Sequence, residues 1–463
     1  MANKLYEEND IAAIATAIRA KNGSSNTYTV SQMAPAINNL PSGGDVNIVN
    51  GIIRNYKAAT STIDASTFVE FVNFIGEDND SEILRNGQSD DVQAVLIDTN
   101  KVFITHKPNG GTGLYCTVCT ISGTTITVGT STMISTSSGS TYTGASTTVL
   151  EANKVFIVHN RSSYAYGVVC TISGTTITVG TDIQLSTDGL SDYYMTATTL
   201  TSSKVFVSHR GGNYLYGVVC TISGTTITVG TDTQLTTTTS TYSDANSIAL
   251  DSSRVFVIYP VSYKLTGAVC SISGTTITIG SGYTLSNENY STRDNAMVLL
   301  DTNKVFIAHG DSYPRFRGVV CTFSGSTITA GTDTLLSTER NTTDVYAHLS
   351  AVKVSAGKVF VAHETRDCLY GALCSISGTT ITKMYDRPLT DKSIASQTFQ
   401  YSSCILLENN KVFVSHRDSS SINAMILTLF DETRVGSSNT MIEGVTKTAC
   451  TTGGTGQVWV LNN

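Results

Sequence analysis

The sequence predicts an all-β protein, an eight-bladed β-propeller that is closed by strands from both termini and preceded by a short N-terminal helical module. The main observation is a phrase of a basic or polar residue, Val, an aromatic residue and a β-branched residue, which returns eight times at intervals of 46 to 54 residues. A period of about 50 residues matches one four-stranded propeller blade. The phrase begins at Lys101, Lys154, Lys204, Arg254, Lys304, Lys358, Lys411 and, with Trp as the aromatic residue, Gln457.

A second phrase, Ser-Gly-Thr-Thr, recurs once per repeat and indicates a tight turn between two strands. It begins at Ser122, Ser173, Ser223, Ser273 and Ser377, and becomes Ser-Gly-Ser-Thr at Ser324. The apolar 40% of the chain is spread in short regular runs between Ser, Thr, Gly and Asn. This composition is typical of a strand-rich and turn-rich protein rather than a disordered one.

Residues 196–237 illustrate the four strands that we expect in each blade. Each strand is a short run rich in β-branched residues and bounded by Ser, Gly, Asn or Asp. Strand A is Thr196–Leu200, strand B is Lys204–His209, strand C is Tyr216–Ile222 and strand D is Ile227–Gly230, with a variable loop over 210–215 between B and C.

Strands from both ends of the chain are expected to close the ring. After the seventh full repeat, residues 447–451 and 457–461 have the pattern of strands A and B, and before the first repeat 53–58 and 68–74 have that of C and D. Together they would form an eighth blade, shared between residues 50–90 and 445–463 of a propeller over 45–463, and would leave no sheet edge exposed. A seven-bladed ring with a separate hairpin is the alternative.

Charge and hydropathy exclude several function classes. The 463 residues have a formal net charge of −7 and only 14% are charged, so no basic field exists to attract nucleic acid. The first residues lack the apolar core of a secretory signal, and no stretch approaches the ~18 apolar residues of a membrane span. We therefore expect a protein that is made in a cytoplasm without a signal peptide and does not insert into membranes.

Cysteine and histidine recur at fixed positions of the repeat, which favours structural roles over binding of a metal or cofactor. Equivalent positions in successive blades lie further apart than the ~4.4–6.8 Å between Cα atoms that a disulfide spans, so we expect small buried hydrophobic residues. The side chains of the CxxC at Cys116 and Cys119 should point to opposite faces of a strand. The recurring cysteines are Cys119, Cys170, Cys220, Cys270, Cys321 and Cys374.

Histidine closes strand B in six blades, and Tyr259 and Asn462 hold the same position in the other two. Metal coordination is not expected, because equivalent positions are spread around the disc, beyond the ~2.0–2.1 Å reach of shared ligands. We expect these side chains to hydrogen-bond the backbone of their own blade. The histidines are His106, His159, His209, His309, His363 and His416.

The loops on the two faces of the expected disc differ in how much they vary. The A–B and C–D turns fall on one face and are nearly constant, whereas the B–C and D–A loops fall on the other and differ in every blade. The variable loops combine Tyr with Ser, Gly and Asn, a composition typical of recognition surfaces. The alternative is that each Tyr packs against a neighbouring blade. The candidate ligand-binding residues are Tyr142, Tyr164, Tyr193, Tyr194, Tyr214, Tyr242, Tyr263, Tyr290, Tyr313, Arg315 and Tyr346.

Catalytic residues are not evident in this sequence. A propeller glycosidase needs two carboxylates about 5–10 Å apart across a sugar, and the acids of the variable loops are scattered without a shared motif. The sialidase signature Ser-x-Asp-x-Gly-x-Thr-Trp, a phosphate-binding loop, HExxH and a nucleophile elbow are all absent from the sequence. We expect a protein that is not an enzyme and has no cofactor, with a propeller glycosidase as the minor alternative.

Residues 1–44 have a helical pattern. Asp10 is placed to cap a first helix that ends at Asn22-Gly23, and a second short helix follows from Ser31 to Pro41. Two such helices bury too little surface to stand alone, so we expect a docking or attachment module. Its apolar attachment residues are Ile11, Ile14, Ile18, Met33, Ile37 and Leu40.

The segments Ile11–Gly23 and Thr29–Leu40 resemble the N-terminal module of tail fibre and receptor-binding proteins of phages, and of phage-tail-like bacteriocins, of Gram-positive bacteria. Asn55-Tyr-Lys-Ala and Phe68-Val-Glu-Phe-Val resemble the spacer strands that follow this module. The resemblance covers about 75 of the 463 residues. It implies a homo-oligomer, a trimer in such proteins, at the virion or tailocin tail tip. The N-terminus would attach to baseplate proteins, and the C-terminal part would bind a host surface glycan or cell-surface protein.

A structural baseplate component, whose variable loops contact neighbouring subunits, is the alternative function. One geometric point favours it. If residues 53–58 were strand C of a blade, the chain would enter the disc on the same face as the variable loops, beside the expected binding surface.

Overall fold

The computed structural model describes most of the repeat region and short segments at both ends of the chain. The expected helical module over 1–44, with its attachment residues, lies outside the described residues. Two compact units are present, one of Met1–Asp78 with Leu427–Asn463 and one of Asn79–Ile426. No helix among the described residues is long and apolar enough to cross a membrane. The described residues are 52–57, 68–85, 92–107, 113–136, 144–237, 245–288, 290–311, 315–337, 349–364, 369–390, 399–407, 411–418, 421–435, 444–446 and 455–460.

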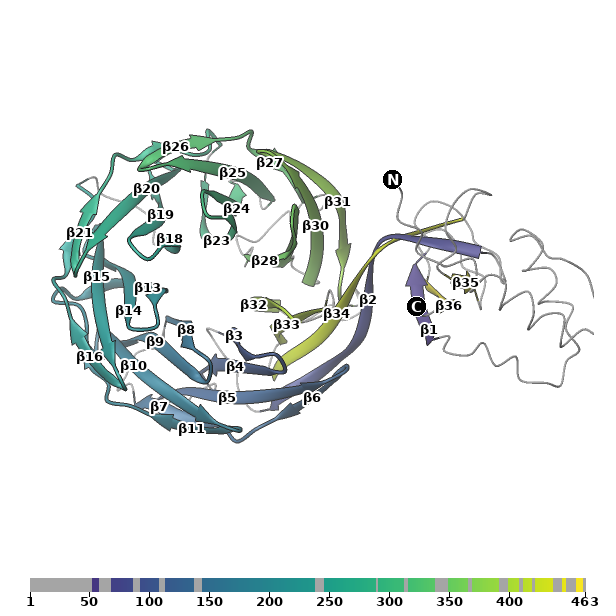
Figure 1. Cartoon of the computed structure of the whole chain (residues 1–463), viewed down its shortest axis with the longest axis horizontal. Helices are drawn as coiled ribbons and strands as arrows, with labels where there is room; N and C mark the ends of the chain where they lie inside the picture. The colour runs from purple at the N-terminus through teal and green to yellow at the C-terminus, as the bar shows by residue number, and fades with distance from the viewer. Residues whose placement is uncertain are drawn as a thin grey trace, which may run out of the picture. The chain divides into compact units, whose positions relative to one another are not determined.

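The described residues of the larger unit form seven sheets arranged in a ring (Figure 1). Each of the first six blades contains four antiparallel strands in sequence order, A to D from the centre outward. Blade 1 has β3 (Gln93–Asp98), β4 (Lys101–His106), β5 (Gly113–Ser122) and β6 (Thr125–Val128); blade 2 has β8 (Ala145–Glu151), β9 (Lys154–Arg161), β10 (Tyr164–Ser173) and β11 (Thr176–Val179); blade 3 has β13 (Leu190–Thr201), β14 (Lys204–Gly211), β15 (Tyr214–Ser223) and β16 (Thr226–Val229).

The next three blades follow the same order. Blade 4 has β18 (Asn246–Asp251), β19 (Arg254–Val261), β20 (Lys264–Ser273) and β21 (Thr276–Ile279); blade 5 has β23 (Tyr290–Asp301), β24 (Lys304–Asp311), β25 (Phe316–Ser324) and β26 (Thr327–Ala330); blade 6 has β28 (Leu349–Ser355), β29 (Lys358–Glu364), β30 (Leu369–Ser377) and β31 (Thr380–Pro388). A short outer strand pairs with strand C in blades 1 to 5: β7 (Thr132–Thr136), β12 (Ile183–Gln184), β17 (Thr233–Gln234), β22 (Tyr283–Thr284) and β27 (Thr334–Leu335).

The seventh blade combines strands from both ends of the chain. Its order is β32 (Phe399–Leu406), β33 (Lys411–Asp418), β34 (Ser421–Val435) and then β2 (Phe68–Arg85) as the outermost strand. Closure by strands from both termini is therefore confirmed. It occurs in blade 7 because β34 continues into the other unit, so the N-terminal strand supplies the position of strand D.

The inner strands form a closed circuit of seven, which rules out the expected eighth blade. Each inner strand contacts the next, and β32 contacts β3 (Figure 1). A hydrogen bond that uses at least one side chain joins every neighbouring pair, at 2.6–3.3 Å. The pairs in ring order are Thr147–Gln93, Ala197–Ser146, Thr196–Ser247, Asn246–Asn295, Lys353–Leu300, Cys404–Ser350 and Ala94–Ser403. The prediction of eight blades was wrong, and the seven-bladed alternative is correct.

The remaining strands assigned to an eighth blade belong to the smaller unit. There β1 (Ile52–Lys57) pairs antiparallel with β36 (Thr455–Val460), and β35 (Gly444–Thr446) pairs with both β36 and β2. Residues 447–451, expected as a strand A, lie outside the described part of the chain. The repeated phrase at Gln457 therefore lies on β36, between β1 and β35 at the far end of the sheet that contains blade 7, and does not mark a blade of its own.

The repeated Phe of strand B packs directly against a repeated Gly of strand C. Phe256 is fully buried, and a Cβ on Gly267 would lie 2.6 Å from its Cε2 atom. The same pairing recurs between Phe156 and Gly167 in blade 2, where a Cβ would lie 2.8 Å from Cζ of the ring. Glycine is required because any side chain would occupy the space of the aromatic ring that fills the core between blades.

The described cysteines are buried free thiols, as expected. Cys116 packs in the core between blades 1 and 2, whereas Cys119 packs in the core between blades 7 and 1. The two side chains of the CxxC therefore point to opposite faces of β5, which confirms the prediction. Burial raises the pKa of the Cys119 and Cys220 thiols to about 12, so these side chains are neutral hydrophobic residues at neutral pH.

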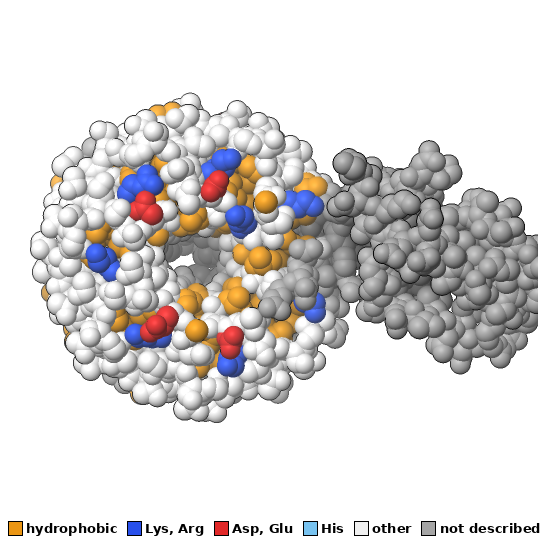
Figure 2. Space-filling model, in the orientation of Figure 1, with side chains coloured by type: hydrophobic (Ala, Val, Ile, Leu, Met, Phe, Trp, Pro, Cys, Tyr) orange, Lys and Arg blue, Asp and Glu red, His pale blue; other side chains and the backbone are white. Residues whose placement is uncertain are grey.

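The face of the A–B turns carries the basic residue that begins each strand B, in a circle around the central opening (Figure 2). Some of these residues tie one blade to the next. Arg254 Nη1 donates to the Gly325 carbonyl oxygen at 2.9 Å in blade 5, and Lys411 Nζ donates to the Gly123 carbonyl oxygen at 3.1 Å in blade 1. The near-constant residues of this face therefore have a structural role.

The same face is where the chain leaves the propeller. Strand β34 runs from the B–C turn toward the face of the A–B turns, as strand C does in every blade, and the larger unit ends at Ile426. The expectation that residues 53–58 bring the chain in beside the variable loops was wrong, because these residues form β1 and pair with β36 instead.

Candidate functional site

The B–C connections in blades 2, 3 and 4 are two-residue turns, shorter than the loop expected over 210–215. Arg210 pairs with Leu215 and Gly211 with Tyr214, which leaves Gly212 and Asn213 as the turn. In blade 4 the turn residues Ser262 and Tyr263 have φ values of 48° and 63°. A non-glycine residue in this left-handed region costs of order 1–3 kcal/mol. Blade 4 therefore presents Tyr263, 49% exposed, on a strained turn.

A histidine–aspartate pair supports the same end of blades 2, 3, 5 and 6. His209 Nε2 lies 2.9 Å from Asp232 Oδ1, and the two side chains are 0% and 2% exposed. The equivalent distances are 3.0 Å for His159–Asp182, 3.2 Å for His309–Asp333 and 2.7 Å for His363–Asp386. We call these four pairs the clamps. The structural role expected for histidine is supported, but its partner is a carboxylate of the same blade; a bond to backbone occurs in addition, from Nδ1 of His159 and His309.

Among blades 1 to 6, the two without such a pair show compensating changes. In blade 1, Ser131 replaces the aspartate and its Oγ lies 3.0 Å from His106 Nε2. Burial without a carboxylate partner lowers the pKa of His106 to about 4. In blade 4, Tyr259 replaces histidine and Gly282 replaces aspartate, where a Cβ would lie 3.0 Å from the tyrosine hydroxyl. The phrase Gly-Thr-Asp at 180–182, 230–232 and 331–333 was a usable sequence signal for the clamps.

Three of the clamps, those of Asp182, Asp232 and Asp333, also join two blades. Asp182 Oδ2 accepts from Ser135 Oγ of blade 1 at 3.0 Å, and Asp232 Oδ2 accepts from the Thr187 backbone N–H of blade 2 at 3.0 Å. Burial alone would raise the pKa of Asp182, but the hydrogen bond and charge of His159, together with the hydrogen bonds from Ser135 and Arg161, outweigh it, and the net pKa is below the usual value. On the face of the B–C turns, we call the line where two blades meet a seam. Each seam is named by its two blades, so that the 4/5 seam lies between blades 4 and 5.

The position opposite the clamp histidine on strand C differs between blades. It is cross-strand to the histidine, or to Tyr259 in blade 4, and so lies in the seam. Where it is tyrosine, the ring lies beside the imidazole, as in His209–Tyr216 with 5.6 Å between centroids and 12° between planes. The residues are Tyr115, Tyr166, Tyr216, Thr266, Arg317 and Tyr370 in blades 1 to 6. The same position of strand C therefore carries an aromatic ring, a hydroxyl group or a guanidinium, depending on the blade.

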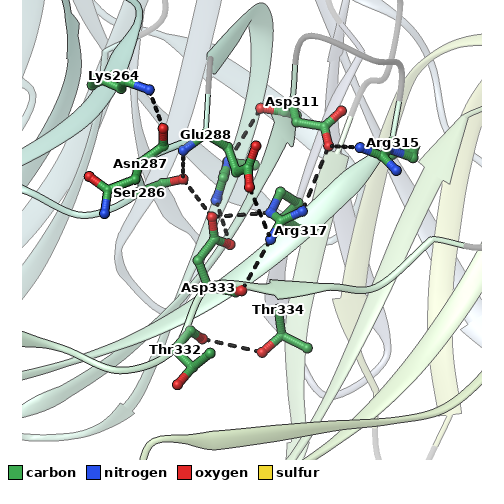
Figure 3. A network of polar contacts seen from close by, with 12 residues as sticks. Lys264, Ser286, Asn287, Glu288, Asp311, Arg315, Arg317, Thr332, Asp333 and Thr334 are labelled. Carbon is green, nitrogen blue, oxygen red and sulfur yellow. Dashed lines mark hydrogen bonds and ion pairs between the residues drawn. The ribbon is translucent and has the colours of Figure 1, made fainter.

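The 4/5 seam is the most highly charged of the described seams (Figure 3). Arg317 Nε donates to Asp333 Oδ2 at 3.1 Å, and its Nη2 donates to the Asp333 carbonyl oxygen at 3.2 Å. Its Nη1 and Nη2 lie 3.9 and 3.8 Å from carboxylate oxygens of Asp311 and Glu288. Arg315 Nη2 donates to Asp311 Oδ2 at 3.0 Å. Arg317, Asp311 and Asp333 were not among the residues chosen from sequence.

The four candidate residues chosen from sequence whose side chains are described lie in different blades or seams and do not form one site. Tyr164 and Tyr214 begin strand C in successive blades and are partly exposed, Tyr263 is at a turn, and Arg315 is in the 4/5 seam. Tyr193, Tyr194 and Tyr290 lie on inner strands, but their side chains are not described. Tyr142, Tyr242, Tyr313 and Tyr346 lie outside the described residues.

Within the described ranges, no group of three or more His, Cys, Asp or Glu side chains is arranged to hold a metal ion. Of the loop acids weighed for catalysis, Glu288 is exposed in the 4/5 seam and Glu364 is buried at the end of strand B in blade 6. The expectation that the protein is not an enzyme stays a prediction.

Comparison with known proteins finds only distant similarity. No protein-family model matches the chain, and no curated protein matches it. Among solved structures, the NanB sialidase from Streptococcus pneumoniae is 12% identical, with 77% of this chain and 69% of that chain covered and a TM-score of 0.44. A lectin from Aleuria aurantia is 11% identical (68% and 100% covered, TM-score 0.42), and a protein from Lactobacillus plantarum is 13% identical (72% and 98% covered, TM-score 0.46). Similarity at this level supports no argument about ligand or activity.

Proposed function

We propose that the protein is a receptor-binding protein of a phage tail or phage-tail-like bacteriocin, which recognises a glycan on the host surface through the seams of its propeller. One observation supports this most directly. The clamps repeat a rigid frame on one face, and the strand C position beside them is a partly exposed tyrosine in blades 2 and 3, a buried threonine in blade 4 and a partly exposed arginine in blade 5, as Tyr166, Tyr216, Thr266 and Arg317 show. A constant frame with changing contact residues is what recognition of an irregular ligand requires.

The chemistry of the seams suits sugars. Tyrosine rings offer flat apolar surfaces for the C–H faces of a pyranose, and neighbouring amides and hydroxyls are available for its hydroxyl groups. In the 1/2 seam, the Tyr166 hydroxyl lies 3.3 Å from Oε1 of the Gln184 side-chain amide. Cζ of Arg161 lies 5.2 Å from the centroid of the Tyr166 ring. Each such site would be weak, and several seams and several copies would supply avidity.

The exit of the chain on the face of the A–B turns supports the same proposal. The seams lie on the opposite face of the propeller from this exit. The attachment of residues 1–44 to baseplate proteins, a homo-oligomeric and trimeric state, and a place at the tail tip are parts of the proposal that rest on the sequence resemblance alone.

A cell-binding experiment tests this function. The fluorescently labelled full chain is incubated with a panel of Gram-positive strains, alongside the variant Tyr164→Ala/Tyr214→Ala/Tyr263→Ala. The matched control, Glu151→Ala/Lys204→Ala/Asp301→Ala, removes three side chains from the face of the A–B turns. We expect strain-specific binding that the tyrosine variant loses and the control retains.

Two results would overturn the proposal. If the folded wild-type chain binds none of the strains, the structural baseplate component becomes the better interpretation. If the tyrosine variant binds as strongly as the wild type, the seams are not the recognition surface.

A further inference from the structure

The 4/5 seam differs from the other described seams in charge. Where blades 1, 2, 3 and 6 have a tyrosine opposite the clamp histidine, blade 5 has Arg317. Arg315 from blade 5 and Lys264 from blade 4 bring two further cations to the seam. The three carboxylates here are Asp311, Asp333 and Glu288. Figure 3 shows the Arg317 guanidinium between these carboxylates.

Two of the carboxylates are fixed parts of the frame. The Asp311 side chain is 2% exposed and contacts both arginines, at 3.0 Å from Arg315 and 3.9 Å from Arg317. The Asp333 side chain is 13% exposed and also holds His309 and the Ser286 hydroxyl. Separating a buried pair leaves an uncompensated charge, so these two carboxylates keep the guanidiniums in position.

Unlike Asp311 and Asp333, Glu288 is exposed and only loosely held. Its side chain is 54% exposed, and its Oε1 is 3.8 Å from Arg317 Nη2, beyond hydrogen-bond distance. Exposed ion pairs of this kind contribute little, because water solvates both charges in either arrangement. Its neighbour Asn287 accepts a hydrogen bond from Lys264 Nζ through the backbone carbonyl, so the ammonium lies on the same side of the seam.

We propose that the 4/5 seam binds an oxyanion of an acidic glycan, a carboxylate or a phosphodiester, and that the Glu288 carboxylate occupies this position in the free protein. The inference rests on the proposed function, since it names the ligand class for the same surface. When Glu288 turns toward solvent, the described residues of the seam comprise three cations and two fixed carboxylates, an excess of one positive charge among these residues. An arginine held on one side by carboxylates presents its remaining N–H groups in a fixed fork that matches a carboxylate or phosphate.

The test titrates the full chain with sodium glucuronate, the phosphodiester glycerophosphoglycerol and neutral glucose at low salt, with binding followed by calorimetry. We expect at least one of the two anions to bind, and added salt to weaken that binding. Binding of glucuronate alone assigns the site to uronic-acid sugars, and binding of glycerophosphoglycerol alone assigns it to phosphodiester polymers. Absence of binding by both anions would overturn the inference.

Two variants test the residues. Arg317→Tyr installs the residue of four other blades and should weaken anion binding about tenfold or more. Glu288→Gln is a surface change that removes the competing carboxylate and should tighten anion binding about two- to fivefold. If Glu288→Gln leaves the affinity unchanged, or Arg317→Tyr binds the anion as the wild type does, the seam is not the site.

The outcomes also separate this inference from the proposed function. Cell binding that depends on the tyrosines, without anion binding, would reject the oxyanion site and leave the receptor-binding role intact. Anion binding by a chain that recognises no cell would reject that role and keep the site.

Discussion

Removal of one clamp carboxylate should destabilise the propeller far more than removal of an exposed carboxylate. Asp232 accepts hydrogen bonds from His209 Nε2 at 2.9 Å and from the Thr187 backbone N–H and hydroxyl at 3.0 and 3.3 Å. In Asp232→Ala these three donors lose their acceptor. Nδ1 of His209 has no hydrogen-bond partner among the described residues, so neither ring nitrogen would then have one.

The magnitude follows from burial. The side chains of His209 and Asp232 are 0% and 2% exposed, so water cannot replace the lost acceptor without opening the 2/3 seam. Breaking a buried pair by removing one partner costs about 3–5 kcal/mol. The matched control is Glu151→Ala, which removes a carboxylate 53% exposed and 3.0 Å from Lys154 Nζ. An exposed pair of this kind contributes about 0–1 kcal/mol.

The assay is equilibrium unfolding of the full chain in urea, followed by circular dichroism, for the wild type and both variants. We expect the free energy of unfolding to fall by about 3–5 kcal/mol in Asp232→Ala and by less than about 1 kcal/mol in Glu151→Ala. Equal losses in the two variants would refute the conclusion that the clamps hold the blades together.

Three further predictions concern packing, protonation and thiol reactivity. Gly267→Ala should cost about 1–3 kcal/mol, because the new methyl group would lie 2.6 Å from Phe256 Cε2; an unchanged urea midpoint would contradict this. His106 should titrate by NMR near pH 4 instead of 6.5. Between these two values the unfolded chain binds a proton that the folded chain does not, so this residue's contribution to stability is complete above pH 6.5 and decreases as the pH falls toward 4. Burial raises the pKa of Cys220 to about 12, so Ellman's reagent should modify it only after denaturation, and rapid labelling of the native protein would argue against this packing.

The sequence predicted the strands of each blade well and the side chains that meet in the seams poorly. The four strands of 196–237 are all present, because β-branched runs and Gly-rich turns act locally. Tyr164, Tyr214 and Arg315 were correctly assigned to the variable face. Arg317 was missed because its importance depends on which residue pairs with His309 across strands, and that register is decided by the sheet.

The sequence by itself determined that this protein is a ring of repeated antiparallel blades, with one constant and one variable face. Local hydrophobic alternation and turn residues are sufficient for that conclusion. Only the tertiary structure decided the number of blades, because closure depends on which inner strands touch, and Ala94 and Ser403 are 309 residues apart in the chain. It also decided the partners of the histidines and the convergence of Arg315, Arg317 and Lys264 in one seam. Contacts between blades join residues that no local pattern relates, so they exist only once the ring has closed.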